Sequence, residues 1–113
     1  ELLRVIIYRE DEKIHTLINP KILKKEGKII IEEGCLSIPG VYGDVERANK
    51  ILVSGVSITG KKIEVEKEGL PAVIIQHEID HLDGILFIDR IKDIKTLRVE
   101  EGYKLPEEIL NRV

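Results

Sequence analysis

The first two thirds of the chain carry short blocks of apolar residues separated by charged turns, a pattern typical of β-strands. Residues 2–8 are apolar and β-branched, and residues 14–18 form a second such block after the charged turn "REDEK". The pair predicts a β-hairpin whose second strand ends at Asn19-Pro20. Further strands are predicted at residues 29–31, 45–57 and 61–66, with a hairpin turn at "SITGKK".

One helix is well marked between Pro71 and Gly84. Proline suits a first helical position, where its missing N–H costs nothing, and glycine suits the position just past a helix end. Apolar side chains recur between the two, and such a helix is expected to be buried against the sheet. These apolar residues are Val73, Ile74, Ile79 and Leu82.

The segment "ILFIDRI" (residues 85–91) is expected to be a strand or an extended arm. Residues 106–113 are expected to form a short terminal helix with two glutamates near its positive end. The elements together predict an α+β fold in which antiparallel β-sheets pack around one central helix. The length of 113 residues is that of a single domain, spanning residues 1–113.

Composition limits the classes of function that fit. A hydrophobic share of 42% and a charged share of 35% are typical of a globular domain. A net charge of -3 with few aromatic residues argues against nucleic-acid recognition, and no apolar run approaches the roughly 20 residues of a membrane span. The start has no signal-peptide pattern, so a cytoplasmic protein is expected. Because Glu1 opens directly into a predicted strand, a preceding segment is expected as well.

The stretch "VIIQHEIDHLDG" (residues 73–84) holds two of the three histidines in an H-E-x-x-H arrangement. Positions i and i+4 share one helix face, so His77 and His81 can both bind one metal ion. Glu78 lies about 100° further round the helix and can act on a water there. The alternative is a pair of ordinary core or surface histidines, but such polar groups are costly on a buried helix unless something pairs them. The motif therefore favours a metal-dependent hydrolase.

A catalytic metal site of this kind needs a third protein ligand. No histidine follows His81, and the near carboxylates, Asp83 and Asp89, stand in no familiar extension of the motif. Upstream, the single cysteine Cys35 lies in a loop bounded by glycine and proline. A lone thiol is often just a small buried apolar group. Beside two histidines, however, Cys35 is the preferred ligand, since thiolates bind iron and zinc strongly.

Two stretches resemble signature motifs of the peptide deformylase family. They are "EGCLS" (residues 33–37) and "QHEIDHLDG" (residues 76–84), and "INP" at residues 18–20 also fits. The resemblance covers essentially the whole chain. It implies a hydrolase of protein biosynthesis and N-terminal processing, which removes the formyl group from the formyl-methionine of newly made polypeptides and releases formate. The ribosome exit region is a further expected partner, whereas nucleic acid and membrane are not expected to be bound.

The resemblance implies a role for each matching residue of the centre. Cys35, His77 and His81 would hold one metal ion, natively Fe²⁺ in most members, for which Zn²⁺, Ni²⁺ or Co²⁺ can substitute. Glu78 would take a proton from the attacking water and later pass it to the departing amine. The backbone N–H of Leu36 would help to stabilise the oxyanion.

Three further residues match family positions that support the centre. These are Gln76, Asp80 and Arg47, which would act through the ligands rather than on the substrate. Without the resemblance, Gln76 and Asp80 are equally well read as a capped or solvated helix face. Arg47 on its own is equally well read as an ordinary surface charge.

The resemblance also implies a pocket for the methionine side chain of the substrate. Leu70 and Ile74 would line this pocket, and Glu33 would lie at its mouth. Without the resemblance, Leu70 and Ile74 would be assigned to the core. His15 lies in a predicted strand with no partner motif, and it is interpreted as structural.

One family motif is absent, a glycine-rich segment ending in A-A-P-Q. Its glutamine donates a hydrogen bond to the oxyanion, and losing one such donor typically costs about 10² to 10³ in rate. The chain is therefore expected to be an N-terminally incomplete deformylase domain. The alternatives are a short metal-binding homologue with little or no activity, and another metal-dependent amidase or peptidase. A purely structural domain with an empty site is a further alternative.

Overall fold

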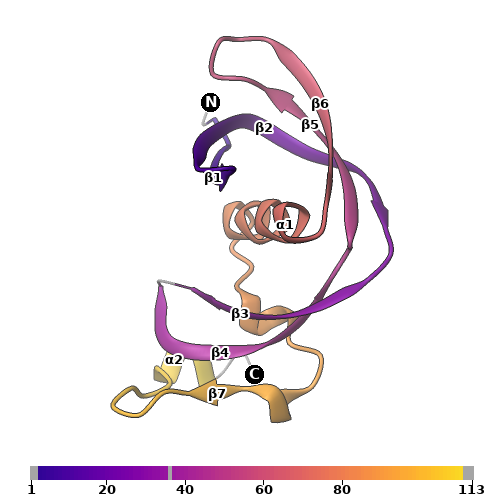
Figure 1. Cartoon of the computed structure of the whole chain (residues 1–113). Helices are drawn as coiled ribbons and strands as arrows, with labels where there is room; N and C mark the ends of the chain where they lie inside the picture. The colour runs from indigo at the N-terminus through magenta and orange to yellow at the C-terminus, as the bar shows by residue number, and fades with distance from the viewer. Residues whose placement is uncertain (1–2, 36, 111–113) are drawn as a thin grey trace. The chain divides into compact units, whose positions relative to one another are not determined.

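The computed structural model describes residues 3–35 and 37–110 of the chain, and Figure 1 shows the order of its elements. The chain divides into two compact units. Unit 1 comprises residues 1–29 and 48–84, and unit 2 comprises residues 30–47 and 85–113. The predicted α+β class is confirmed, because both units contain strands and the principal helix lies in unit 1.

Unit 1 contains a four-stranded sheet and the principal helix. The strand order is β1-β2-β5-β6, and each neighbouring pair is antiparallel. The elements are β1 (Val5–Glu10), β2 (Lys13–Glu26), β5 (Lys50–Val56), β6 (Lys62–Glu68) and α1 (Leu70–Leu82).

The β1–β2 hairpin forms where the sequence predicts it. Its two-residue loop places Asp11 and Glu12 at φ of 53° and 63°, as the tight turns favoured in hairpins require. The second predicted hairpin, β5–β6, is also confirmed, with Gly60 at φ 88° in its turn. The Ser57 N–H donates to the carbonyl of Lys61 at 2.8 Å and closes that turn.

The predicted end of the second strand at Asn19-Pro20 is wrong. Strand β2 continues to Glu26 and pairs with β5 on both sides of an irregularity between Ile18 and Lys21. Asn19 takes a φ of 52° there, and its N–H donates to the carbonyl of Arg4 at 2.6 Å. A bulge accommodates Pro20, which lacks an N–H for the ladder, so the strand bends instead of ending.

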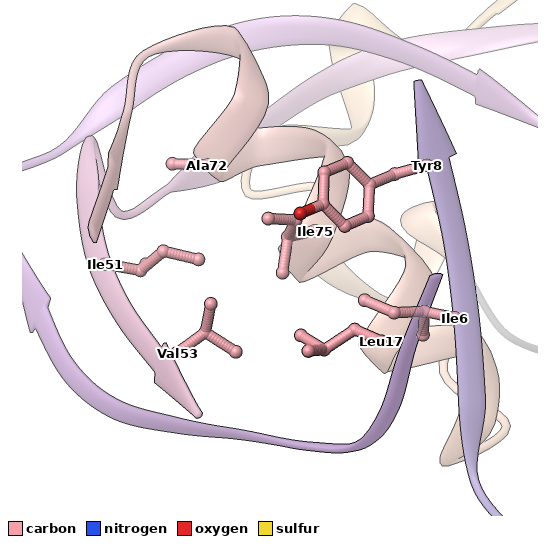
Figure 2. Packing of buried hydrophobic residues seen from close by; sticks show 7 residues of the cluster. All are labelled: Ile6, Tyr8, Leu17, Ile51, Val53, Ala72 and Ile75. Carbon is pink, nitrogen blue, oxygen red and sulfur yellow. The ribbon is translucent and has the colours of Figure 1, made fainter. Parts of the chain in front are cut away.

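The core of unit 1 lies between the sheet and one side of α1. Figure 2 shows how apolar side chains from β1, β2, β5 and α1 converge on this space. Alternate residues of each strand point inward, which places the i and i+2 positions of a strand on the same face. The buried members are Ile6, Tyr8, Leu17, Ile51, Val53, Ala72 and Ile75.

Unit 2 contains a three-stranded sheet and short helical turns. The strand order is β3-β4-β7, and β4 pairs antiparallel with β7. The elements are β3 (Ile29–Cys35), β4 (Ile38–Arg47), η1 (Phe87–Arg90), η2 (Ile94–Thr96), β7 (Arg98–Val99) and α2 (Glu107–Leu110). The core of this unit consists of Ile38, Val41, Val45, Phe87 and Ile88.

The strand or arm expected at residues 85–91 is instead a short 3-10 helix, η1. The Leu86 N–H donates to the Asp89 carboxylate at 2.8 Å, and the Asp89 N–H donates to the Leu86 carbonyl at 2.9 Å. The consecutive residues Phe87 and Ile88 are both buried. A strand would direct them to opposite faces, whereas a helical turn brings both into one core.

Helix α2 occupies the start of the helix predicted at residues 106–113, of which residues 111–113 lie outside the described range. In the part of the chain that the structure describes, no helix is both long and apolar enough to cross a membrane.

Candidate metal centre

Helix α1 (Leu70–Leu82) begins and ends within two residues of the positions that the sequence marks. Gly69 at φ 72° precedes it, and Pro71 lies in its first turn, where no N–H is needed. Gly84 at φ 72° follows it, and its N–H donates to the carbonyl of His81 at 3.1 Å. These ends fix the helical register and therefore fix which side chains share a face.

The two histidines of α1 lie one turn apart. The ring centroids of His77 and His81 are 4.4 Å apart, with the planes tilted by 56°. Both residues are half-buried, as is Glu78 between them. This confirms that the i, i+4 spacing brings the two imidazoles side by side.

Gln76 attaches the helix to the chain segment that leads into β5. Its Nε2 donates to the carbonyls of Ala48 at 2.8 Å and Ala72 at 3.0 Å. Its Oε1 accepts from the Ala48 N–H at 3.1 Å. The residue is 5% exposed, so the interpretation as a solvated helix face is wrong. Asp80, one turn further along, is also buried.

Cys35 is the last residue of β3 in unit 2 and is half-buried. Its Sγ lies 3.1 Å from the hydroxyl of Ser37 and accepts from the Ser37 N–H at 3.4 Å. Both contacts come from Ser37, two residues later in the chain, so local contacts orient the sulfur. Leu36, whose N–H is expected at the oxyanion, lies outside the described residues.

Glu33 and Arg47 form a buried ion pair between β3 and β4. Arg47 Nε lies 2.8 Å from Glu33 Oε2, and Arg47 Nη2 lies 2.8 Å from Glu33 Oε1. The side chains are 7% and 4% exposed for Glu33 and Arg47, so the alternative of a surface arginine is wrong. The structure thus gives Glu33 a partner inside unit 2, and its role at a pocket mouth stays a prediction.

The two residues expected to line a methionine pocket differ in burial. Leu70, at the start of α1, is 55% exposed, so the alternative that assigns it to the core is wrong. Ile74 is partly buried and packs against the core of unit 1. His15, in contrast, stacks on Tyr8 with ring centroids 5.2 Å apart, which agrees with the structural role expected for it.

A groove of about 410 Å³ in unit 2 was not predicted from the sequence. Cys35 and Tyr42 line it together with Glu100 and Tyr103 of the C-terminal segment. The sequence offers no signal for it, because the pairing of β7 with β4 that brings these residues together joins positions more than fifty residues apart.

The donor set of the predicted centre is one thiol and two imidazoles. Cys35, His77 and His81 each offer one ligand atom, and each is partly buried. Sulfur and nitrogen donors suit Zn²⁺ and divalent iron, cobalt or nickel better than the oxygen-preferring Mg²⁺ or Ca²⁺. An α+β chain with this set and an H-E-x-x-H helix has the residues of a metal-dependent hydrolase.

Comparisons with known proteins identify the family. A model of the polypeptide deformylase family matches residues 3–97. The chain is 54% identical over 95 residues to the peptide deformylase of Hydrogenovibrio crunogenus, covering 84% of this chain and 56% of that protein. It is 41% identical over 102 residues to that of Chromobacterium violaceum, covering 90% of this chain and 61% of that protein.

Solved structures agree with this assignment. A peptide deformylase from Synechococcus elongatus, in complex with actinonin, superposes with a TM-score of 0.76 at 43% identity, covering 80% of this chain and 50% of that one. The enzyme from Thermotoga maritima superposes with a TM-score of 0.76 at 38% identity, covering 80% of this chain and 62% of that one. The chain belongs to the polypeptide deformylase family, which confirms the resemblance seen in its motifs. It spans 56% and 61% of the length of the two curated relatives named above.

Proposed function

We propose that this chain is a metal-dependent hydrolase that removes the N-terminal formyl group from the formyl-methionine of newly made polypeptides and releases formate. The observation that carries the proposal is the pair His77 and His81, whose rings lie 4.4 Å apart with Glu78 between them in the chain. Membership of the deformylase family connects that arrangement with formyl-peptide hydrolysis. The 113 residues act in this proposal as one catalytic domain.

The proposed ligands are Cys35, His77 and His81, and the proposed ion is Fe²⁺, one per chain, with Zn²⁺, Ni²⁺ or Co²⁺ able to replace it. Three protein donors leave a position open for chemistry, as catalytic sites require. When bound, the ion supplies Lewis-acid polarisation of the formyl oxygen and lowers the pKa of water toward about 7.

Glu78 moves the proton in this reaction. Its carboxylate takes one proton from the attacking water while the water oxygen bonds to the formyl carbon. It then delivers that proton to the methionine nitrogen as the carbon–nitrogen bond breaks. The products are formate and a peptide with a free amine. The N–H of Leu36 is proposed to donate to the oxygen on which negative charge develops.

The remaining residues position the substrate and the ligands. We assign Leu70 and Ile74 to the pocket for the methionine side chain, with Glu33 at its mouth. Gln76 and Asp80 hold the ligand-bearing helix from its buried side, and Arg47 holds β3 through Glu33. The reaction is placed in the cytoplasm, on nascent chains near the ribosome exit.

The test is formate release from a formyl-methionyl peptide by the 113-residue chain loaded with Fe²⁺ without oxygen, with metal content measured on the same sample. The acetyl-methionyl peptide is the matched substrate control, because a site shaped for a formyl group excludes the extra methyl. Turnover of the formyl peptide alone supports the proposal. Stoichiometric metal without turnover would favour a metal-binding homologue, and equal turnover of both peptides would favour a general amidase.

A further inference from the structure

The groove of unit 2 contains an acidic and aromatic wall supplied by the segment after β7. Its floor includes Gly34, Cys35 and Tyr42, and its wall includes Glu100 and Tyr103. The match to the deformylase family ends at residue 97, so the wall comes from a segment that the family model does not match. This wall lies beside Cys35, a proposed metal ligand that lines the same groove.

Backbone pairing holds the wall in place. Val41 pairs with Val99 in the β4–β7 ladder, and the Glu100 N–H donates to the Gly40 carbonyl at 2.7 Å. The Tyr103 N–H donates to the Glu100 carbonyl at 3.0 Å and closes the turn. Strand pairing and this hydrogen bond therefore hold the start of the segment against β4.

Two glycines allow aromatic rings to lie against this backbone. A Cβ at Gly40 would come within 2.2 Å of the Tyr103 ring. A Cβ at Gly34 would come within 2.8 Å of the Tyr42 ring. Any larger residue would push the rings away, so the glycines are required for the shape of the groove.

The charge around the groove is negative. Glu100 lies close enough to Tyr42 to raise the pKa of its phenol, first through its charge and also through a hydrogen bond. The guanidinium nearest this face, Arg98, is paired with both Glu32 and Asp44. Glu32 also acts on the Tyr42 phenol through its charge, and Glu100 itself lines the groove, so the face is acidic.

We infer that this groove binds a lysine or arginine side chain of the substrate peptide, a few residues after the formyl-methionine, through Glu100 and the rings of Tyr42 and Tyr103. The inference rests on the proposed function, which places the formyl end of the peptide at Cys35. Tyrosine rings attract a cation placed over their faces, and a carboxylate accepts its N–H donors. An acidic side chain would be repelled by the same wall.

The test compares formyl-methionyl tetrapeptide amides that carry lysine, glutamine or glutamate at the second, third or fourth position. Formate release by the metal-loaded chain should favour lysine over glutamine by about two- to fivefold, as for an exposed cation on a carboxylate and an aromatic ring. Because neighbouring side chains of an extended peptide point to opposite sides, the preference should be confined to one position. Glutamate there should be the poorest substrate.

Glu100→Gln should bring the lysine-to-glutamine ratio close to 1, and Tyr103→Leu should reduce it. Glu101→Gln is the matched control, because it removes a neighbouring exposed carboxylate that does not line the groove and should leave the ratio unchanged. A lysine preference that survives Glu100→Gln, or no preference at any position, would overturn the inference.

A binding measurement separates this inference from the proposed function. The same peptides without the formyl group are titrated into the Zn²⁺-loaded, ¹⁵N-labelled chain, and the amide shifts of Gly40, Glu100 and Tyr103 are followed. Tighter binding of the lysine peptide, lost in Glu100→Gln, supports the groove even if no formate is released. Formate release without any lysine preference in rate or binding leaves the proposed function standing and refutes the groove.

Discussion

Gln76 and Ala48 exchange two hydrogen bonds, although they are 28 residues apart in the chain. The side-chain amide of Gln76 satisfies both the N–H and the C=O of one residue, as a neighbouring strand would. The residue that follows Gln76 is His77, the first histidine of the H-E-x-x-H motif. The helix that carries both imidazoles is therefore fixed to the chain at the entrance of β5.

Gln76→Ala should lower the free energy of unfolding by about 2 kcal/mol, because it removes the partner of two partly buried backbone groups of Ala48. For a chain of this length, that corresponds to a decrease in Tm of roughly 10 °C. Thermal unfolding followed by circular dichroism measures the change. Glu78→Ala, on the same helix but half-buried, is the control and should change stability by less than about 1 kcal/mol. Equal effects of the two substitutions would contradict the anchoring role of Gln76.

Arg47→Met should destabilise the chain by about 3–5 kcal/mol, because it leaves the Glu33 carboxylate buried without its partner charge. Replacing both residues together, as Glu33→Leu with Arg47→Met, should restore much of the loss. Urea unfolding of the unchanged chain, the two single variants and the double variant gives the coupling free energy between Glu33 and Arg47. The exposed pair of Arg98 and Glu32, with side chains 47% and 55% exposed, is the control, and Glu32→Gln should cost less than about 1 kcal/mol. A loss of that small size for Arg47→Met would show that the buried pair is not structural.

Glu78→Ala should retain metal at one ion per chain and lose formate release, because it removes the proposed proton carrier and no proposed ligand. General acid–base catalysis typically contributes about 10² to 10⁴ in rate, so the activity should fall by at least that range. Metal content and turnover are measured on one preparation. Glu64→Ala, an exposed glutamate of β6, is the control and should keep both. Retention of most activity in Glu78→Ala would refute the assigned role.

Cys35→Ala should lose bound metal after mild purification, since two imidazoles on one helix bind an ion only weakly without a third donor. The measurement is metal stoichiometry, with folding checked by circular dichroism. His15→Asn is the matched control, because His15 is an imidazole outside the motif and stacks on Tyr8. Unchanged stoichiometry in Cys35→Ala would exclude the cysteine as a ligand.

Tyr42 should ionise at higher pH than an ordinary tyrosine. The charge of Glu100, burial of the phenol and its hydrogen bond to Glu100 all raise the pKa of Tyr42. Because the folded pKa lies above the unfolded value near 10, the stabilisation is fully present below about pH 10 and is lost as the pH rises through the folded value. Ultraviolet titration of the phenolate measures this shift, with Tyr42→Phe to assign the signal. Glu100→Gln should lower the pKa of Tyr42, and an unchanged titration would place Glu100 away from the phenol.

The sequence alone determined the elements whose signals are local. Pro71 and Gly84 mark the limits of α1 because their backbone preferences act within one turn, and the spacing of His77 and His81 fixes a shared face. The two hairpins followed from apolar blocks around short turns. The α+β class and the family were available from the same patterns.

The tertiary structure decided what depends on pairing between distant segments. Strand β2 runs past Pro20 because β5 offers partners on both sides of a bulge, and residues 87–90 form a helical turn because two adjacent apolar side chains enter one core. The ion pair of Glu33 with Arg47 likewise depends on the fold, because Arg47 alone is equally well read as a surface charge until β3 and β4 lie side by side. Local signals fix backbone preference over a few residues, whereas burial and charge pairing depend on strand register, which no single stretch of sequence contains.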